Sequence, residues 1–109
     1  MSKQPIKDYV NAYRKTKKGA RVRTITNIRR YEPGFTISEE DWDTHWNATS
    51  CFVCSSDLPV GTDTRKHYDH EHGSSLYRGT LCSKCNQALG LLGDNIETIT
   101  KLIQYLEAQ

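Results

Sequence analysis

The sequence predicts a small α+β fold, mostly helical, in which a helix crosses a β-hairpin and a bound metal holds these elements together. Three observations support this prediction. Two C-x-x-C motifs offer the four thiolates of a zinc site. A histidine–carboxylate cluster lies between these motifs, in a region with two short segments that suit strands. Segments with helical caps and helical spacing of apolar residues lie before and after this region.

Length and composition limit the chain to one small domain. It has 109 residues, of which 36% are hydrophobic, so the core must be modest. Domains of this size often depend on a bound metal or an oligomer interface. No apolar run approaches the roughly 20 residues that a membrane span requires. The polar, basic N-terminus lacks the apolar stretch of a secretory signal, so we expect a cytoplasmic protein without a membrane partner.

Charge divides the chain into a basic N-terminal arm, residues 1–30, and an acidic body, residues 31–109. The arm has ten basic residues and one acidic residue, for a net charge of +9, whereas the body has five basic and twelve acidic residues, for −7. A basic arm on an acidic body is typical of proteins that bind a polyanion, and nucleic acid is the first candidate. A solvated tail that keeps the protein soluble explains the charge equally well.

The basic arm has the signals of a helix. We expect this helix over residues 5–18, with Pro5 at its first position and Gly19 as its C-terminal cap. Residues 20–30 are ambiguous, because apolar residues at helical spacing alternate with β-branched threonines.

A second helix is predicted after the turn at residues 31–34. Ser38 is its N-cap, and the helix runs to about Ala48. Trp42 and Trp46 share one face of this helix, as core anchors. His45, in the same helix, is expected to pack or to face solvent rather than to bind a metal.

The second half of the chain alternates between strand and helix signals. Strands are predicted over residues 64–70 and 75–81, and a short helix over residues 83–92 that Gly93 ends. Asp94 is predicted to cap a last helix. The apolar residues of that helix form one stripe, which belongs either to the core or to a dimer interface.

Four cysteines form the predicted zinc site: Cys51, Cys54, Cys82 and Cys85. Each C-x-x-C turn offers two thiolates at the separation that tetrahedral zinc requires, and no cysteine is left over. Such a closed site stabilises the fold and carries out no chemistry. Two disulfides or a redox thiol pair are weaker alternatives, because nothing in the sequence indicates a secretory route.

The cluster between the cysteine pairs suits phosphodiester cleavage. On a strand, His70 and His72 would point one way and Asp69 the other, and a bend at the strand end would bring Asp69 and His70 to one site. A neutral His70 can take a proton from water near pH 7. The oxygens of Asp69 and Asn86 suit Mg²⁺, which neutralises the phosphate. Arg78 is positioned to clamp a phosphate oxygen. His67 is expected to be structural or exposed.

At these residues the sequence closely resembles the recombination endonuclease VII family of His-Me finger, or HNH-like, nucleases. The resemblance rests on the first C-x-x-C motif, on the D-H-x-H cluster at residues 69–72, on R-G-x-L-C-x-x-C-N at residues 78–86, and on Leu89-Gly90. The lead-in segment at residues 34–42 also resembles the family. The similarity spans about residues 34–106, and the basic arm resembles the family's arms only in its charge.

The resemblance implies a role for each matching residue. The four cysteines would bind structural zinc, Asp69 and Asn86 would bind the catalytic Mg²⁺, and Mn²⁺ is expected to substitute. His70 would be the general base, with His72 assisting near the phosphate or the metal. The products would carry a 5′-phosphate and a 3′-hydroxyl. One departure is Leu89, where some members of the family have a glutamate, so a third acidic group would be missing or come from elsewhere.

The function expected from this reasoning is that of a metal-dependent DNA endonuclease. The best-known activity of the family is cleavage of branched DNA such as Holliday junctions, for which a homodimer would suit paired nicks. A less structure-selective nickase is the second nuclease hypothesis, and no residue separates the two. A non-catalytic zinc module that only binds nucleic acid is a third. The family is rich in phage proteins, so a phage-encoded enzyme would act in the host cytoplasm.

Overall fold

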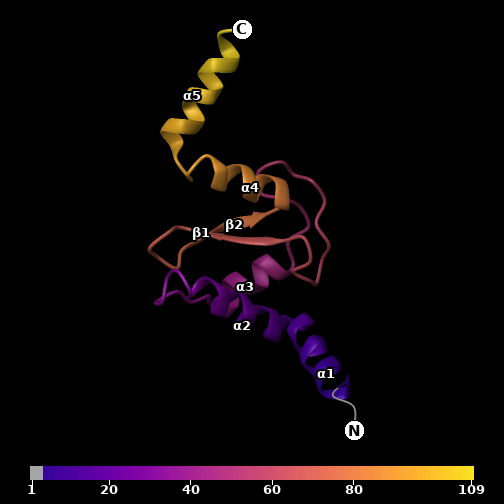
Figure 1. Ribbon diagram of the computed structural model, residues 1–109. Helices are drawn as coiled ribbons and strands as arrows, with labels where there is room; N and C mark the ends of the chain where they lie inside the picture. Colours follow the sequence, from indigo (N-terminus) through magenta and orange to yellow (C-terminus); the bar gives the residue numbers. More distant parts are fainter. Residues whose placement is uncertain (1–3) are drawn as a thin grey trace.

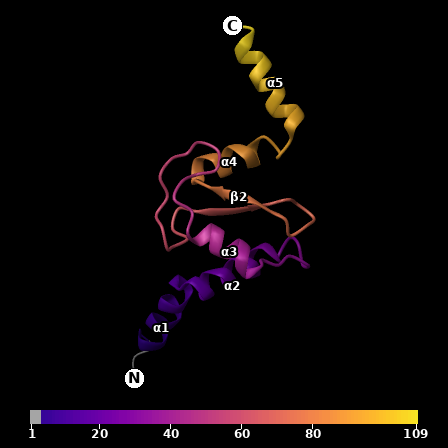
Figure 2. The same ribbon diagram turned by 180° about the vertical axis from the view of Figure 1, so that it is seen from behind.

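The computed structural model describes residues 4–109, with side chains from residue 7 onward. A two-stranded antiparallel hairpin forms the centre of the molecule, with α2 and α3 below it and α4 above it in the view of Figure 1. Helices α1 and α5 extend from opposite ends, which gives the molecule extents of 66 × 30 × 28 Å. Figure 2 shows the same layers from behind. The elements are α1 (Gln4–Lys15), α2 (Lys17–Ile28), α3 (Glu39–Trp46), β1 (His67–His70), β2 (Tyr77–Leu81), α4 (Ser83–Leu91) and α5 (Ile96–Glu107). This architecture confirms the predicted small α+β fold, in which a helix crosses a hairpin.

The basic N-terminal arm contains two helices rather than one. The prediction of a single helix capped by Gly19 is wrong, because the chain breaks at Thr16 and α2 begins directly afterwards. The backbone of Thr16 is extended, and its side chain accepts a hydrogen bond from the Gly19 N–H, as an N-cap does. Gly19 itself lies inside α2, where a Cβ would come within 1.9 Å of the Tyr13 carbonyl oxygen. Its small size therefore permits the close turn between α1 and α2.

The ambiguous stretch at residues 20–30 is helical almost to its end. Thr24 and Thr26, whose β-branching weakened the helical signal, donate their hydroxyl hydrogens to carbonyls four residues earlier. Ala20 and Ile25 are buried, so packing decides the conformation where propensity is neutral.

Helix α3 lies where the sequence predicts it. Ser38 accepts a hydrogen bond from the Asp41 N–H as its N-cap. Trp42 is buried in a core cluster with residues of α2, and Trp46 packs against that cluster, so both act as the expected core anchors. His45 packs in the interior, 1% exposed, and its Nδ1 lies 2.8 Å from the Thr80 hydroxyl oxygen in β2.

The hairpin is antiparallel and its register shifts once. Asp69 pairs with Gly79, whereas His70 pairs with Tyr77, so Arg78 is an extra residue on β2. Gly73 has a φ of 81° in the connecting turn, a value that glycine adopts without strain. The shift falls at the end of β1, within the predicted catalytic cluster.

The last helix begins one residue later than predicted. Asn95, not Asp94, is its N-cap, and the Asn95 side chain accepts a hydrogen bond from the Thr98 N–H. Asp94 has a φ of 53° and pairs with Arg78 instead. Gly93, with a φ of 70°, ends α4 as expected. Helix α5 buries none of its residues, so its apolar stripe is not part of the core of the single chain.

Candidate active site and metal centres

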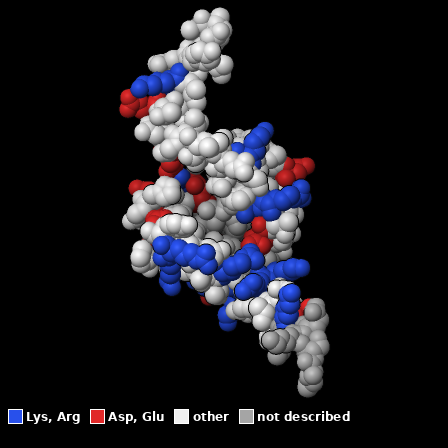
Figure 3. All heavy atoms as spheres, in the orientation of Figure 1, with Lys and Arg blue, Asp and Glu red and all other residues white. Residues whose placement is uncertain are grey.

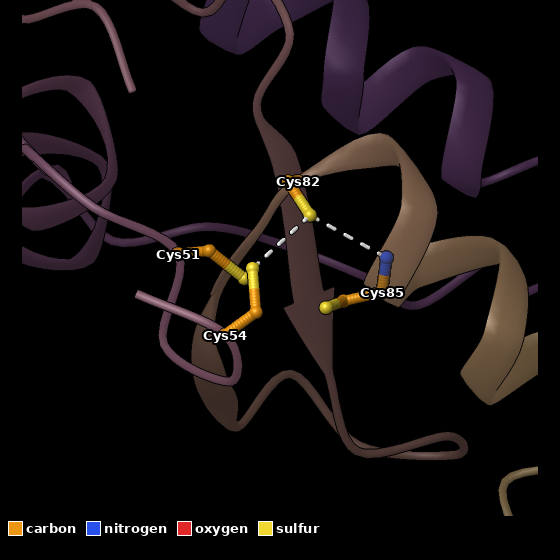
Figure 4. Close-up of side chains that lie close together, drawn as sticks. All are labelled: Cys51, Cys54, Cys82 and Cys85. Atoms are coloured by element: carbon orange, nitrogen blue, oxygen red, sulfur yellow. Dashed lines mark hydrogen bonds between the residues drawn. The ribbon is translucent and has the colours of Figure 1, made fainter. Parts of the chain in front are cut away.

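The four cysteines come together at one end of the hairpin (Figure 4). Cys51 and Cys54 lie in a turn after α3, and Cys82 and Cys85 lie at the start of α4. Their sulfurs all lie within 4.8 Å of one another, and the Cys54 and Cys82 sulfurs are 3.8 Å apart. Zinc–thiolate bonds of about 2.3 Å in a tetrahedron place the sulfurs about 3.8 Å apart. The cluster therefore has the donor set and the spacing of a structural metal site, and none of its cysteines is in a disulfide.

Electrostatics at this cluster favours a bound cation. Burial opposes ionisation of Cys51, but the nearby N–H groups of Cys82, Cys54 and Val53 outweigh it and lower the pKa of this thiol to about 6. Burial and the neighbouring thiols raise the pKa of Cys85 to about 12. The four sulfurs cannot all ionise at neutral pH by themselves, and a divalent ion removes this conflict.

The two predicted Mg²⁺ ligands, Asp69 in β1 and Asn86 in α4, lie on the side of the hairpin that α4 covers. The Asn86 side-chain N–H₂ lies 3.3 Å from His67 Nδ1. His67 and Asp69 are two residues apart in β1, so their side chains point to the same face. Because the Asn86 nitrogen faces His67, its carbonyl oxygen is available as a hard ligand. Asp69 and Asn86 make no direct hydrogen bond in the described part of the chain. His67, expected to be structural or exposed, lies half-buried as the neighbour of Asn86, with Nε2 3.0 Å from the Ser83 hydroxyl.

Arg78, the extra residue of β2, lies between two carboxylates. It donates to both oxygens of Asp69, at 2.8 and 3.0 Å, and to both oxygens of Asp94, at 3.2 and 3.0 Å. These hydrogen bonds raise the pKa of Arg78 further above its already high value. The guanidinium thus holds the acids together, and a role in clamping phosphate stays a prediction.

His70 lies on the opposite face of the hairpin, toward α2. Its ring packs on Phe35, with centroids 4.5 Å apart, and its side chain is only 8% exposed. Its Nε2 is 2.7 Å from a carboxylate oxygen of Glu32, in the turn after α2. The other oxygen of Glu32 accepts a hydrogen bond from the Gly73 N–H at 2.8 Å. That hydrogen bond, followed by the one with His70, lowers the pKa of Glu32, so this residue is a carboxylate at neutral pH.

Sequence reasoning missed Glu32. It lies 38 residues before His70, in a turn whose residues suit any surface loop. No local pattern in the chain marks it, because only the packing of the turn after α2 on β1, through Phe35, brings it to the histidine.

His72 joins the two faces at the end of the hairpin. Its Nδ1 lies 3.7 Å from a Glu32 oxygen, and its Nε2 lies 3.8 Å from an oxygen of Asp94. A continuous series of charged and titratable groups therefore runs from Glu32 through His72, Asp94 and Arg78 to Asp69. The structure brings Asp69, Arg78 and the two histidines of the D-H-x-H cluster to one end of the hairpin. It does not bring His70 and Asn86 into contact.

A comparison with family models identifies the chain. The model of the recombination endonuclease VII family matches residues 27–108, which include the hairpin, α4 and all four cysteines. The chain belongs to the recombination endonuclease VII family.

Similar proteins are found among phage proteins. The Gene 59 protein of Mycobacterium phage D29 is 32% identical over 91 residues, which cover 82% of this chain and 54% of the phage protein. The Gene 59 protein of Mycobacterium phage L5 is 33% identical over 70 residues, which cover 62% of this chain and 42% of that protein. This family member thus spans about half the length of the curated relatives that it matches.

A solved structure shares the fold of this endonuclease VII family member. The ββα-Me type II restriction endonuclease Hpy99I aligns with 75% of this chain and 47% of its own, at a TM-score of 0.51 and 25% identity. The ββα-Me description agrees with the observed order of β1, β2 and α4.

Proposed function

We propose that this chain is a metal-dependent DNA endonuclease that hydrolyses phosphodiester bonds. One observation carries the proposal: a two-stranded hairpin crossed by α4, with Asp69 and Asn86 on the α4 side and His70 at the strand end. Membership of the family and the ββα-Me neighbour support the same activity. Binding of nucleic acid alone requires neither a buried histidine at the strand end nor a carboxylate and an amide on the α4 side of the hairpin.

The catalytic metal would be held by Asp69 and Asn86. A carboxylate and an amide oxygen are hard donors that suit Mg²⁺ or Mn²⁺, so the residues fit the ion that the family implies. When bound, the ion supplies positive charge beside the phosphate and the departing oxygen. Arg78 now occupies both oxygens of Asp69. We propose that Arg78 exchanges this contact for a phosphate oxygen when substrate binds.

His70 would act as the general base. Because Glu32 is a carboxylate, it accepts a hydrogen bond, so the Nε2 of neutral His70 carries the proton. The lone pair of the imidazole then lies on Nδ1, the atom that would take a proton from the attacking water. Glu32 thereby fixes the tautomer that the reaction needs. His72, more exposed than His70, would assist near the phosphate or the metal.

Four cysteines would hold zinc as a structural ion. The site ties the turn after α3 to the start of α4, which positions Asn86 one residue after Cys85. Loss of this ion would therefore displace a catalytic ligand.

The basic arm, residues 1–30, would bind the DNA backbone beside the nuclease domain, residues 31–109. Basic side chains gather over α1 and α2 in Figure 3, whereas acidic ones are scattered over the rest of the same face. A groove between α1 and α2 is lined by Arg14, Arg23 and Arg30 together with Tyr13. Contacts of this kind would make affinity fall with salt.

We further propose that the substrate is branched DNA, cut by a homodimer to leave 5′-phosphate and 3′-hydroxyl ends. Helix α5 is the evidence for the dimer. Its apolar residues Leu102, Ile103 and Leu106 are about half exposed or more, and none of the residues of this helix is buried in the single chain. Among the described residues no helix is long and apolar enough to cross a membrane. The phage relatives support action in the host cytoplasm.

Cleavage of a labelled four-way junction and of its matched linear duplex, with Mg²⁺ or with a chelator, tests this proposal. Paired cuts at the junction, dependent on the metal, are expected. The His70→Ala variant should lose cleavage by about 100-fold or more and keep DNA binding and the zinc held by the four cysteines. Equal cleavage of both substrates would contradict the selectivity for branched DNA and indicate a less selective nickase. Binding without any cleavage would refute the nuclease.

A further inference from the structure

A second group of metal-ligating side chains lies on the α2 side of the hairpin. It consists of Glu32, His70 and His72, whose ligand atoms all lie within 4.8 Å of one another. A Glu32 oxygen lies 2.7 Å from His70 Nε2 and 3.7 Å from His72 Nδ1. The cluster shares no residue with the Asp69 and Asn86 pair or with the four cysteines.

The spacing of these atoms suits one small ion. Metal–nitrogen and metal–oxygen bonds of about 2.1 Å separate neighbouring ligand atoms by about 3.0 Å in an octahedron and about 3.4 Å in a tetrahedron. The observed distances of 2.7 and 3.7 Å lie on either side of these values. Small side-chain adjustments would therefore bring all three atoms to bonding distance.

An outer partner already orients one of the three ligands, and a carboxylate lies close behind a second. The Glu32 oxygen that faces away from the histidines accepts a hydrogen bond from the Gly73 N–H, at 2.8 Å. The Nε2 of His72, opposite the nitrogen that faces Glu32, lies 3.8 Å from Asp94. A carboxylate behind a histidine and a hydrogen bond behind a carboxylate are the outer partners that metal ligands have in proteins.

An ion can reach the cluster from solvent. His72 is 70% exposed, and a pocket beside it is lined by Asn27, Ile28 and Tyr31 together with Glu32 and the two histidines. His70 forms the buried wall of this pocket and is 8% exposed. The site is thus open on the His72 side, which leaves coordination positions for water.

We propose that Glu32, His70 and His72 bind one transition-metal ion of the zinc class. Two imidazoles and one carboxylate favour such a borderline ion over Mg²⁺, which prefers oxygen ligands. The nearby charges also favour a cation, because Glu32 belongs to the cluster and an Asp94 oxygen lies 3.8 Å from His72, whereas Arg78 pairs with Asp94 and Asp69.

Binding at this site would inhibit the nuclease, an effect that rests on the function proposed above. An ion on Nε2 of neutral His70 leaves the proton on Nδ1, so the ring has no lone pair to accept a proton from water. Zinc would therefore inhibit cleavage, because it would take the place of the Nε2 proton of His70 that Glu32 otherwise holds.

Zinc counting by equilibrium dialysis tests the site without any assay of activity. The full chain should bind two zinc ions, one tightly at the cysteines and one more weakly. Glu32→Gln and His72→Ala should each weaken the second ion at least about tenfold while the first is retained, which shows that the variants are folded. Glu71→Gln, a change at an exposed neighbouring carboxylate, should leave both ions bound. A single ion in the wild type, or a second ion held equally in both variants, would overturn the proposal.

The same zinc concentrations added to the cleavage assay test the regulatory consequence. Inhibition should follow occupancy of the second site and require more zinc in His72→Ala. Cleavage unaffected at full occupancy would overturn the inhibitory role. A chain that binds the second ion but cuts no DNA in Mg²⁺ alone would refute the nuclease and leave the metal site standing.

Discussion

The buried His45 should make the stability of this protein depend on pH. It lies in α3 with its Nδ1 2.8 Å from the Thr80 hydroxyl, and it is 1% exposed. Burial, followed by the nearby charges of Lys66 and His67, lowers the pKa of His45 from 6.5 to about 4. The native protein therefore holds this imidazole neutral under the hairpin.

The direction and size of the effect follow from this pKa. In the unfolded chain the imidazole titrates near 6.5, so its contribution to stability is complete above that pH. As the pH falls from 6.5 toward 4, the unfolded chain takes up a proton that the native protein does not, and stability is lost. Between pH 7.5 and pH 5 the free energy of unfolding should fall by about 2 kcal/mol from this residue alone.

Urea unfolding of the wild type and of His45→Gln, at pH 7.5 and pH 5 with zinc in excess, measures this contribution. Glutamine can keep a hydrogen bond to Thr80 but does not titrate. The wild type should lose about 2 kcal/mol more than the variant over this range. Because other groups titrate in both proteins, only the difference between the two is used. Parallel losses would refute the reasoning.

Three further predictions concern packing. Trp42→Ala should lower the free energy of unfolding by about 3–5 kcal/mol, measured by urea denaturation, because the side chain is 1% exposed; a loss below 1 kcal/mol would contradict the core. Gly79→Ala should destabilise by about 1–3 kcal/mol, because its Cβ would lie 2.5 Å from the Phe52 ring, and Phe52→Ala should relieve that cost. Leu102→Glu with Ile103→Glu should convert a dimer to a monomer in sedimentation without loss of helix; a monomeric wild type would contradict the α5 interface.

Local signals predicted much of the fold. The spacing of the cysteines indicated the metal cluster, and Ser38 and Gly93 marked helix ends through their own side chain or backbone freedom. The break at Thr16 was missed because a single turn separates two helices of similar composition. The sequence predicts Asp94 as the cap, because Glu97 follows three residues later as in a capping box, but Asp94 pairs with Arg78 and Asn95 caps the helix instead.

The candidate site was predictable only in part, because it combines local and distant residues. Asp69, His70 and His72 lie within four consecutive residues, so the sequence alone predicts the chemistry of that cluster. Strand alternation predicts that Asp69 and His70 lie on opposite faces of the hairpin. It does not predict the shift in register at His70. Glu32 reaches His70 only because the turn after α2 packs on β1 through Phe35, and no local pattern in the sequence predicts that contact.

Single-turnover cleavage of a four-way junction in Mg²⁺ by Asn86→Ala and by its neighbour variant Gln87→Ala tests the central claim most directly. Both side chains lie in the first half of α4, but only Asn86 faces the hairpin through His67. Asn86→Ala should cleave at least about 100-fold more slowly with its zinc content unchanged, whereas Gln87→Ala should match the wild type. Equal rates in all three proteins would contradict a catalytic metal between β1 and α4.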